Sequence, residues 1–199
     1  MSPVWDLPTR LFHWAVVFIV ALAWWSAEEE RYSIHEWAGY SLLTLLLTRI
    51  VWGFIGSRHS RFSDFLAGPS SIVAYLKGAA PNSPGHNPLG GWSVVALLGL
   101  LLLQAVSGLF NTDDVFFNGP LYYAAEGGFR DAMGQVHDIA FNVLLGLVGL
   151  HLVVVFYHQW VKRDGMIRAM ITGSAPGRVG QGPVTASWKA LLILIVVAG

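Results

Sequence analysis

An all-α integral membrane protein is the fold class that the sequence predicts, and three observations lead to it. Hydrophobic residues make up 54% of the 199 residues and charged residues only 12%, and the mean hydropathy is +0.54. Ordinary soluble domains contain about 25% charged residues. Four apolar runs are long enough to cross a hydrocarbon core of about 30 Å as helices. Lysine and arginine residues gather on one side of these runs.

The four predicted spans follow one another along the chain, and a shorter apolar run comes after them. The spans lie near Leu11–Ala27, His35–Ile55, Trp92–Phe110 and Met133–Val161. Only Arg10 precedes the first run as a cation, and the small-residue cleavage site of a secretory signal is missing, so we expect a retained span. The fifth run, Ala186–Gly199, has 14 residues, about 21 Å as a helix. It is consistent with a short span, an interfacial helix or the start of a longer helix.

Polar segments connect the spans outside the membrane. Gly56–Gly91 and Ala175–Pro183 are rich in glycine, proline or serine, which favours loops. The third connection, Asn111–Ala132, contains four acidic residues, Asp113, Asp114, Glu126 and Asp131. Such a loop is normally solvated, but it could also dock a basic partner. We expect residues 1–173 to form a four-helix bundle in the membrane, and residues 174–199 to form a linker and the short fifth helix.

The distribution of cationic residues predicts a cytoplasmic N-terminus, because lysine and arginine near span ends are retained in the cytoplasm. With that orientation ten cations lie inside and two outside. The inner ten are Arg10, Arg49, Arg58, Arg61, Lys77, Lys162, Arg163, Arg168, Arg178 and Lys189, and the outer two are Arg31 and Arg130. Most tryptophans fall near the predicted boundaries, where amphipathic indoles are favoured.

Composition and motifs exclude several classes of protein. The absence of cysteine excludes disulfides, thiolate-bound iron–sulfur clusters and the attachment motif of c-type haem. A net charge of zero gives no basic field for nucleic acid. His35-Glu36 lacks the second histidine of a zinc-protease motif, and a glycine-rich phosphate loop is missing. Any metal must therefore be held by histidine, methionine or carboxylate.

Four histidines fall within the predicted spans, where polar side chains are costly and usually functional. His13 lies near the cytoplasmic end of the first span, and His35 begins the second span at the outer side. His137 and His151 share the fourth span, 14 residues apart. That spacing advances a helix by about 21 Å and ends about 40° short of four full turns, so both imidazoles lie on nearly the same face. Matching depths pair His13 with His151 and His35 with His137.

Each pair predicts a site for a b-type haem. An iron porphyrin takes one axial ligand from each side, so two facing helices that each supply a histidine at one depth can hold it. We therefore expect two non-covalent haems, one near each membrane face, each with two histidine ligands.

Other interpretations of the histidines remain open. Any one of the four could be a core residue that makes a hydrogen bond between helices. His158, one heptad after His151, competes with it for the inner site, although its neighbours Gln159, Trp160 and Lys162 indicate the interface. His59 and His86 are expected to be solvated loop residues.

Small and cationic residues near the histidines support haem binding. Gly39, one turn after His35, leaves room for a flat macrocycle, as do Gly146 and Gly149 before His151, although glycine is common in membrane helices. Haem propionates are anionic and pair with cations. Candidate partners are Arg10 and Arg49 at the inner haem, and Arg31 or Arg130 at the outer haem. Snorkelling explains the same arginine positions.

Several motifs resemble those of the bacterial cytochrome b-561 family, which includes b-type subunits of nickel–iron hydrogenases. The likeness extends to about Gly173, and its most specific parts are the N-terminal motif and the spacing of His137 and His151. The motifs are Asp6-Leu7-Pro8-Thr9-Arg10, Phe12-His13-Trp14, His35 with Gly39, Arg49 with Trp52-Gly53, Gly56-Ser57-Arg58, the segment 85–90, and Asp113-Asp114. The run after Ala186 departs from the four-helix pattern.

The resemblance implies a four-helix protein of the bacterial inner membrane. Its two haems would be bound by His13, His35, His137 and His151. It would exchange electrons between the quinone pool and a redox partner protein, such as a soluble cytochrome or a dehydrogenase subunit.

Two other functions remain open. One is a self-contained membrane oxidoreductase that couples quinone to a small outer-side substrate such as superoxide. The other is a haem-free transporter or structural bundle. We favour the electron-transfer subunit, because the sequence offers no constellation for small-molecule catalysis beyond the histidines.

Overall fold

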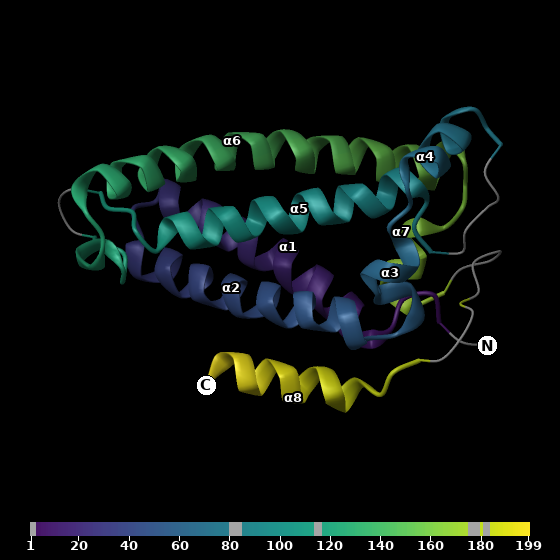
Figure 1. Cartoon of the computed structure of the whole chain (residues 1–199), viewed down its shortest axis with the longest axis horizontal. Coiled ribbons are helices and arrows are strands. Elements are labelled where there is room, and N and C mark those ends of the chain that lie inside the picture. The colour runs from purple at the N-terminus through teal and green to yellow at the C-terminus, as the bar shows by residue number, and fades with distance from the viewer. Residues whose placement is uncertain (1–2, 80–84, 114–116, 175–179, 181–183) are drawn as a thin grey trace. The chain divides into compact units, whose positions relative to one another are not determined.

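The computed structural model describes residues 3–79, 85–113, 117–174, 180 and 184–199. Within these residues the regular secondary structure is helical, and isolated bridge residues occur at Thr112, Asn118 and Gly180. Four of the described helices are long and apolar enough to cross a membrane (Figure 1). They are α1 (Leu7–Glu28), α2 (Tyr32–Ile55), α5 (Pro88–Gly108) and α6 (Gly127–Phe156), which continues into a π-helical turn, η3 (Tyr157–Val161). The predicted all-α membrane class is confirmed.

Shorter helices lie between and after the spans. They are η1 (Arg58–Ser60), α3 (Phe62–Phe65), α4 (Pro69–Leu76), η2 (Tyr122–Ala124), α7 (Met166–Thr172) and α8 (Ser187–Ala198). The last of these is the predicted short apolar helix after the four spans. The connection expected at Gly56–Gly91 contains three of them. Asp114 of the acidic loop, and all of the linker Ala175–Pro183 except Gly180, lie outside the described residues.

The helix α1 begins at Leu7, four residues before the predicted span, because Asp6 caps it. The Thr9 N–H donates to Asp6 Oδ1 at 2.9 Å, which satisfies one of the free donors of the first turn. Pro8 is tolerated there because the first turn needs no N–H from it. Likewise α6 begins at Gly127, six residues before the prediction, where the Arg130 N–H donates to the Glu126 carbonyl at 3.0 Å.

The chain divides into two compact units, and each long helix contributes to both. Unit 1 comprises Met1–His13, Leu47–Ala96 and Leu150–Gly199, and unit 2 comprises Trp14–Leu46 and Leu97–Gly149. The predicted inner pair, His13 and His151, belongs to unit 1. The predicted outer pair, His35 and His137, belongs to unit 2.

Unit 1 is organised by buried polar side chains from four segments. Asp6 and Trp52 are each 2% exposed, and the Trp52 indole donates to Asp6 Oδ2 at 3.0 Å. The Thr9 and Ser60 hydroxyls lie 2.7 Å apart. These contacts join the start of α1, the end of α2 and η1, so they fix the backbone just before His13.

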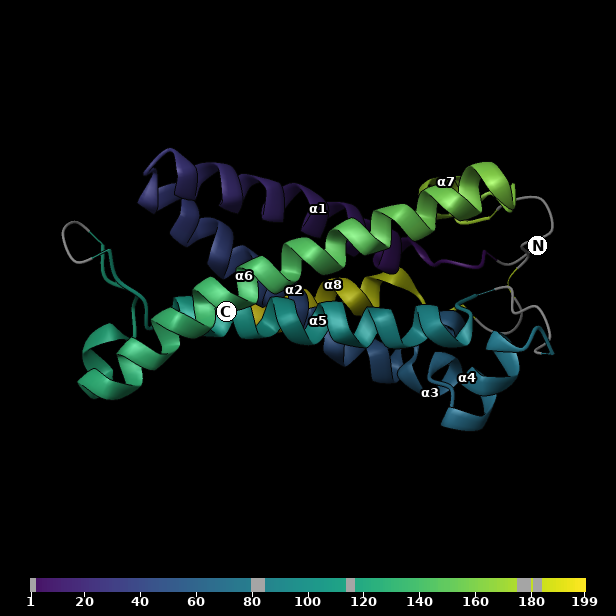
Figure 2. The ribbon, with the colours of Figure 1, turned by 90° about the horizontal axis from the view of Figure 1, so that it is seen from above.

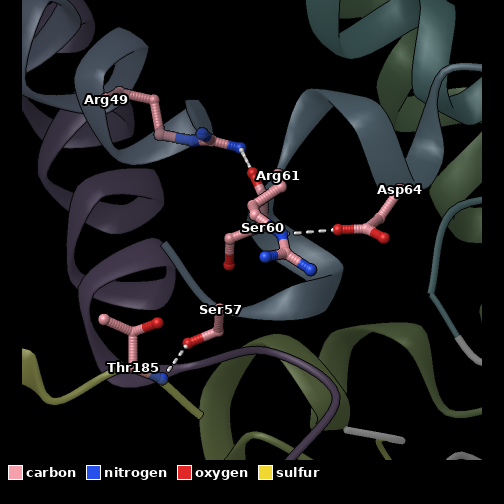
Figure 3. A network of polar contacts seen from close by, with 6 residues as sticks. All are labelled: Arg49, Ser57, Ser60, Arg61, Asp64 and Thr185. Carbon is pink, nitrogen blue, oxygen red and sulfur yellow. Dashed lines mark hydrogen bonds and ion pairs between the residues drawn. The ribbon is translucent and has the colours of Figure 1, made fainter. Parts of the chain in front are cut away.

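Figure 3 shows how the same network reaches further. The Arg49 guanidinium donates to the Ser60 carbonyl at 3.1 Å. The Thr185 N–H, just before α8, donates to Ser57 Oγ at 3.0 Å, and an ion pair joins Arg61 to Asp64 at 2.6 Å.

The N-terminal segment is held against α7, which contacts η3 beyond the end of α6 (Figure 2). The backbone N–H groups of Val4 and Trp5 both donate to the Gly173 carbonyl, at 2.8 and 3.2 Å. Val4, Trp5 and Ala169 form a buried apolar cluster. These hydrogen bonds and this apolar cluster therefore link the first described residues to the segment after the fourth span.

Unit 2 has an apolar core to which α2, α5 and α6 contribute buried side chains. Its buried apolar side chains are Ala38, Leu42, Leu46, Leu98, Leu101, Ala140 and Leu144. The Tyr32 ring stacks on Phe117 at 6.0 Å, which closes the outer loop over the start of α2.

Asp6 should govern acid stability. Burial raises the pKa of Asp6, but hydrogen bonds from Ser57, Thr9 and Trp52 outweigh it, and the net pKa lies below the ordinary 3.8. The ionised carboxylate therefore stabilises the fold fully above the unfolded-state pKa of 3.8. This contribution is lost as the pH falls through the lower, folded-state pKa.

Asp6→Ala should lower the free energy of unfolding by about 1–3 kcal/mol at neutral pH, measured by denaturation in detergent. It should also flatten the loss of stability in acid. Asp64→Ala is the control, because a surface ion pair contributes only about 0–1 kcal/mol. Equal effects of the two variants would contradict the prediction.

Candidate functional site

The outer histidine pair comes together within unit 2. His35 on α2 and His137 on α6 have ring centroids 6.2 Å apart, with ring planes at 76°. Both residues are half-buried. The structure thus brings together two residues that the sequence paired by depth alone.

A main-chain carbonyl fixes the protonation of His35. Its Nδ1 lies 2.8 Å from the Ala23 carbonyl oxygen on α1. Because a carbonyl can only accept, Nδ1 carries the hydrogen and donates it. The neutral ring then has its lone pair on Nε2, which is the nitrogen that can bind a metal.

His137 is fixed in the same way by α5. Its Nδ1 lies 3.0 Å from the Gln104 carbonyl oxygen and 3.2 Å from Ser107 Oγ. The Ser107 hydroxyl donates to the Gln104 carbonyl at 3.1 Å, so its oxygen is left to accept from Nδ1. The Nε2 lone pair of His137 therefore points away from these acceptors. In this structure it accepts from the side-chain amide of Gln104 at 3.0 Å.

Two glycines leave space around this pair. A Cβ on Gly108 would lie 3.0 Å from His137 Cε1, so only glycine allows α5 to approach the ring this closely without a shift. A Cβ on Gly39 would have no atom within 4 Å, so space is open one turn from His35. The role of Gly39 as a residue that leaves room for a macrocycle stays a prediction.

The helix α5 contributes residues around His137 that were not predicted from the sequence. Gln104, Ser107 and Gly108 all contact His137, yet none was predicted as a site residue. A signal was present, because Gln104 and Ser107 are polar residues three positions apart in an otherwise apolar span. Positions three and four apart share one helix face, so the pair marks a polar face on α5.

The inner histidines, His13 and His151, lie close enough within unit 1 to interact electrostatically. Both are half-buried, one on the first turns of α1 and the other near the end of α6. The two members of the second predicted pair therefore lie in the same unit.

Two arginines of unit 1, one buried and one partly buried, have buried donor atoms without a hydrogen-bond acceptor among the described residues. Arg49 is 4% exposed, and its Nη1 has no such acceptor, although Nη2 donates to Ser60. Arg10 donates through Nη1 to the Ile171 carbonyl at 2.6 Å, while its buried Nε has no such acceptor. Unsatisfied buried guanidinium donors favour an anionic ligand. Of the predicted outer candidates, Arg31 is exposed and Arg130 packs over the Tyr122 ring at 4.3 Å.

The other three histidines have different surroundings. His158 lies on η3, is buried, and pairs through Nδ1 with Asp164 Oδ2 at 2.7 Å. The expectation that His86 is a solvated loop residue was wrong, because its ring packs against Trp5 at 4.5 Å and Phe65 at 4.9 Å. His59 is half-buried. Burial and the nearby Arg58 lower the pKa of His59, against the opposing effect of Asp64.

This donor set fits a haem better than a bare cation. Among the residues with described positions, no three His, Asp or Glu side chains converge on one point, whereas haem iron requires only two protein ligands because the porphyrin supplies four. His35 and His137, whose ring centroids lie 6.2 Å apart, are the two residues of unit 2 that would hold such a group.

Comparison with known proteins gives one match. The family model for prokaryotic cytochrome b561 matches residues 4–173. No curated protein and no solved structure matches the chain. The match includes all four paired histidines and all of α5, and it ends just after α7.

Gly108→Ala should disturb the outer site. A methyl group 3.0 Å from His137 Cε1 must displace the ring, and overpacking of this kind costs about 1–3 kcal/mol. We expect the haem affinity of this site to fall about fivefold or more, measured by haem titration of the low-spin absorption band. Gly99→Ala on the same helix is the matched control, because a Cβ there meets nothing within 4 Å. A Gly108→Ala protein that binds haem as the Gly99→Ala protein does would contradict the role given to Gly108.

Proposed function

The chain belongs to the prokaryotic cytochrome b561 family, and from this we propose that it carries electrons across the bacterial inner membrane between the quinone pool and a redox partner protein. As a member of this family it is a membrane-spanning b-type cytochrome of electron transfer. We assign two haems to residues 1–173, and the family match over residues 4–173 supports this boundary. Residues 174–199, with α8, lie outside the match.

The single observation that carries the proposal is the geometry of His35 and His137. Their ring centroids lie 6.2 Å apart, and each Nδ1–H is bound to a main-chain carbonyl. In each ring Nδ1 therefore carries a hydrogen, and Nε2 is the nitrogen that would serve as a ligand. Haem, when bound, supplies reversible one-electron chemistry at its iron. If His35 and His137 both bound the iron, the site would be suited to electron transfer rather than to binding a small ligand.

We assign His13 and His151 to the second haem. Their electrostatic contact within unit 1 supports the pairing. The unsatisfied donors of Arg10 and Arg49 support an anion in the same unit, and we assign them to the haem propionates. A guanidinium that pairs with a propionate stabilises the bound macrocycle and offsets its negative charge.

We place the quinone reaction near His158. Quinone reduction takes up protons as well as electrons, so a proton-carrying group must lie near a haem. His158 is buried and bound to the Asp164 carboxylate, and it lies seven residues beyond His151, about 10 Å along a helix. The π-helical turn that contains it is typical of functional positions in helices.

The acidic outer loop favours a basic redox partner. Glu126 and Asp131 are exposed, whereas Asp113 accepts the Phe117 N–H at 2.6 Å and so also orders the loop. Exposed carboxylates steer a basic protein toward this face and set the rate of encounter more than the affinity.

The haem ligands can be tested in pairs. We expect about two haems per chain by pyridine haemochrome assay, both low-spin. His13→Ala and His151→Ala should alter one step of a redox titration, and His35→Ala and His137→Ala the other, because an iron that loses one axial imidazole becomes five-coordinate or is lost. His158→Ala should keep both low-spin haems but slow their reduction by quinol.

Three results would contradict these assignments. Fewer than one haem per chain would exclude the di-haem cytochrome. A His158→Ala protein that lost the inner haem beside an intact His151→Ala protein would exchange the ligands. Rapid turnover of superoxide with quinone by the purified chain alone would favour the self-contained oxidoreductase.

The proposed orientation can be tested with reporter fusions. The cation asymmetry places the segment 111–132 in the periplasm and the segments 56–91 and 162–183 in the cytoplasm. Alkaline phosphatase, which requires export, should be active when fused within the first segment and inactive within the other two. The opposite pattern would reverse which haem faces which compartment.

A further inference from the structure

We infer that Gln104 is a positioning residue for the outer haem: its side-chain amide holds the iron-binding nitrogen of His137 until haem enters, and then moves away. The inference rests on the proposed function, since it takes His137 as a haem ligand. It adds a residue on α5, the long helix without a histidine ligand.

The first step is the tautomer of His137. The Gln104 carbonyl and the Ser107 hydroxyl oxygen both accept from Nδ1, at 3.0 and 3.2 Å. Nδ1 therefore carries the hydrogen and Nε2 the lone pair. These acceptors do not involve the Gln104 side chain, so the tautomer stays fixed when that side chain changes or moves.

The Nε2 lone pair of His137 is occupied by the Gln104 side chain. The side-chain nitrogen of Gln104 lies 3.0 Å from His137 Nε2, and an amide NH₂ can only donate. The same lone pair cannot bind both this hydrogen and an iron. Haem binding at His137 therefore requires the Gln104 amide to leave.

The side-chain amide of Gln104 is only partly satisfied by hydrogen bonds. Gln104 Oε1 is buried and has no hydrogen-bond partner among the described residues. The amide is thus satisfied at its nitrogen and unsatisfied at its oxygen, which costs free energy in a buried site. A group bound on one side only is readily displaced. If the Gln104 amide were absent, Nε2 of His137 in the haem-free chain would lose this donor.

Removal of the amide should therefore strengthen haem binding at the outer site. A net hydrogen bond changes an equilibrium by about two- to tenfold, so Gln104→Leu should lower the dissociation constant of the outer haem by that factor. Ser107→Ala should act in the opposite direction, because it removes an acceptor from Nδ1–H. It should weaken binding and raise the midpoint potential, since a less basic imidazole stabilises ferric iron less. Gln135→Leu, at an exposed position on α6, is the matched control.

The experiment is a haemin titration of the full chain purified from haem-limited cells, followed by redox titration. Gln104→Met is measured beside Gln104→Leu, and thermal unfolding identifies any variant that fails to fold. In parallel, ¹⁵N resonances of the haem-free chain should show the Nδ1–H tautomer of His137. The Nε2 resonance should shift in Gln104→Leu while the Nδ1 resonance stays in place.

The outcomes separate the inference from the proposed function. If His137→Ala keeps both low-spin haems, the ligand assignment itself fails. If His137→Ala loses the outer haem, but folded Gln104→Leu and Gln104→Met bind it no more tightly than Gln135→Leu, the inference on Gln104 is overturned. An unshifted Nε2 resonance in Gln104→Leu would also overturn it.

Discussion

The requirement that a buried imidazole satisfy its N–H is the constraint on which the outer site depends. In an apolar helix bundle no water is available for this purpose. His35 and His137 both meet the requirement with a main-chain carbonyl, from Ala23 and Gln104. Both rings are thereby fixed in one tautomer with the same nitrogen left to bind iron. The positions of α1 and α5 beside the two histidines follow from this need.

Unit 1 is stabilised by a buried network of polar side chains. Two of its buried polar side chains, Asp6 and Arg49, are charged, and both main-chain and side-chain groups satisfy them. Asp6 accepts from Thr9 and Trp52, and Arg49 donates to Ser60. A buried carboxylate is stable only when such donors converge on it. This network fixes the first turn of α1, which carries His13, while Arg49 and Arg10 keep donors for an anion.

The sequence predicted the spans and proposed the histidine pairs, but it did not predict the groups that contact the histidines. The spans follow from the length of apolar runs, and the pairs from helical phase and depth, all of which can be counted along the chain. Gln104 and Ser107 were missed because polar residues in a span can serve many purposes. His86 was misjudged because its loop composition indicates solvent, whereas Trp5 and Phe65 cover its ring.

The sequence by itself determined the all-α membrane class and the position of each histidine along its predicted span, because hydrophobicity and helical periodicity are local properties. Only the tertiary structure decided which imidazole nitrogen carries the hydrogen and which arginine donors have no acceptor among the described residues. The acceptors of His35 and His137 lie 12 and 33 residues away in the chain. A hydrogen bond over that separation exists only when packing brings two helices together, and packing is a property of the folded protein as a whole.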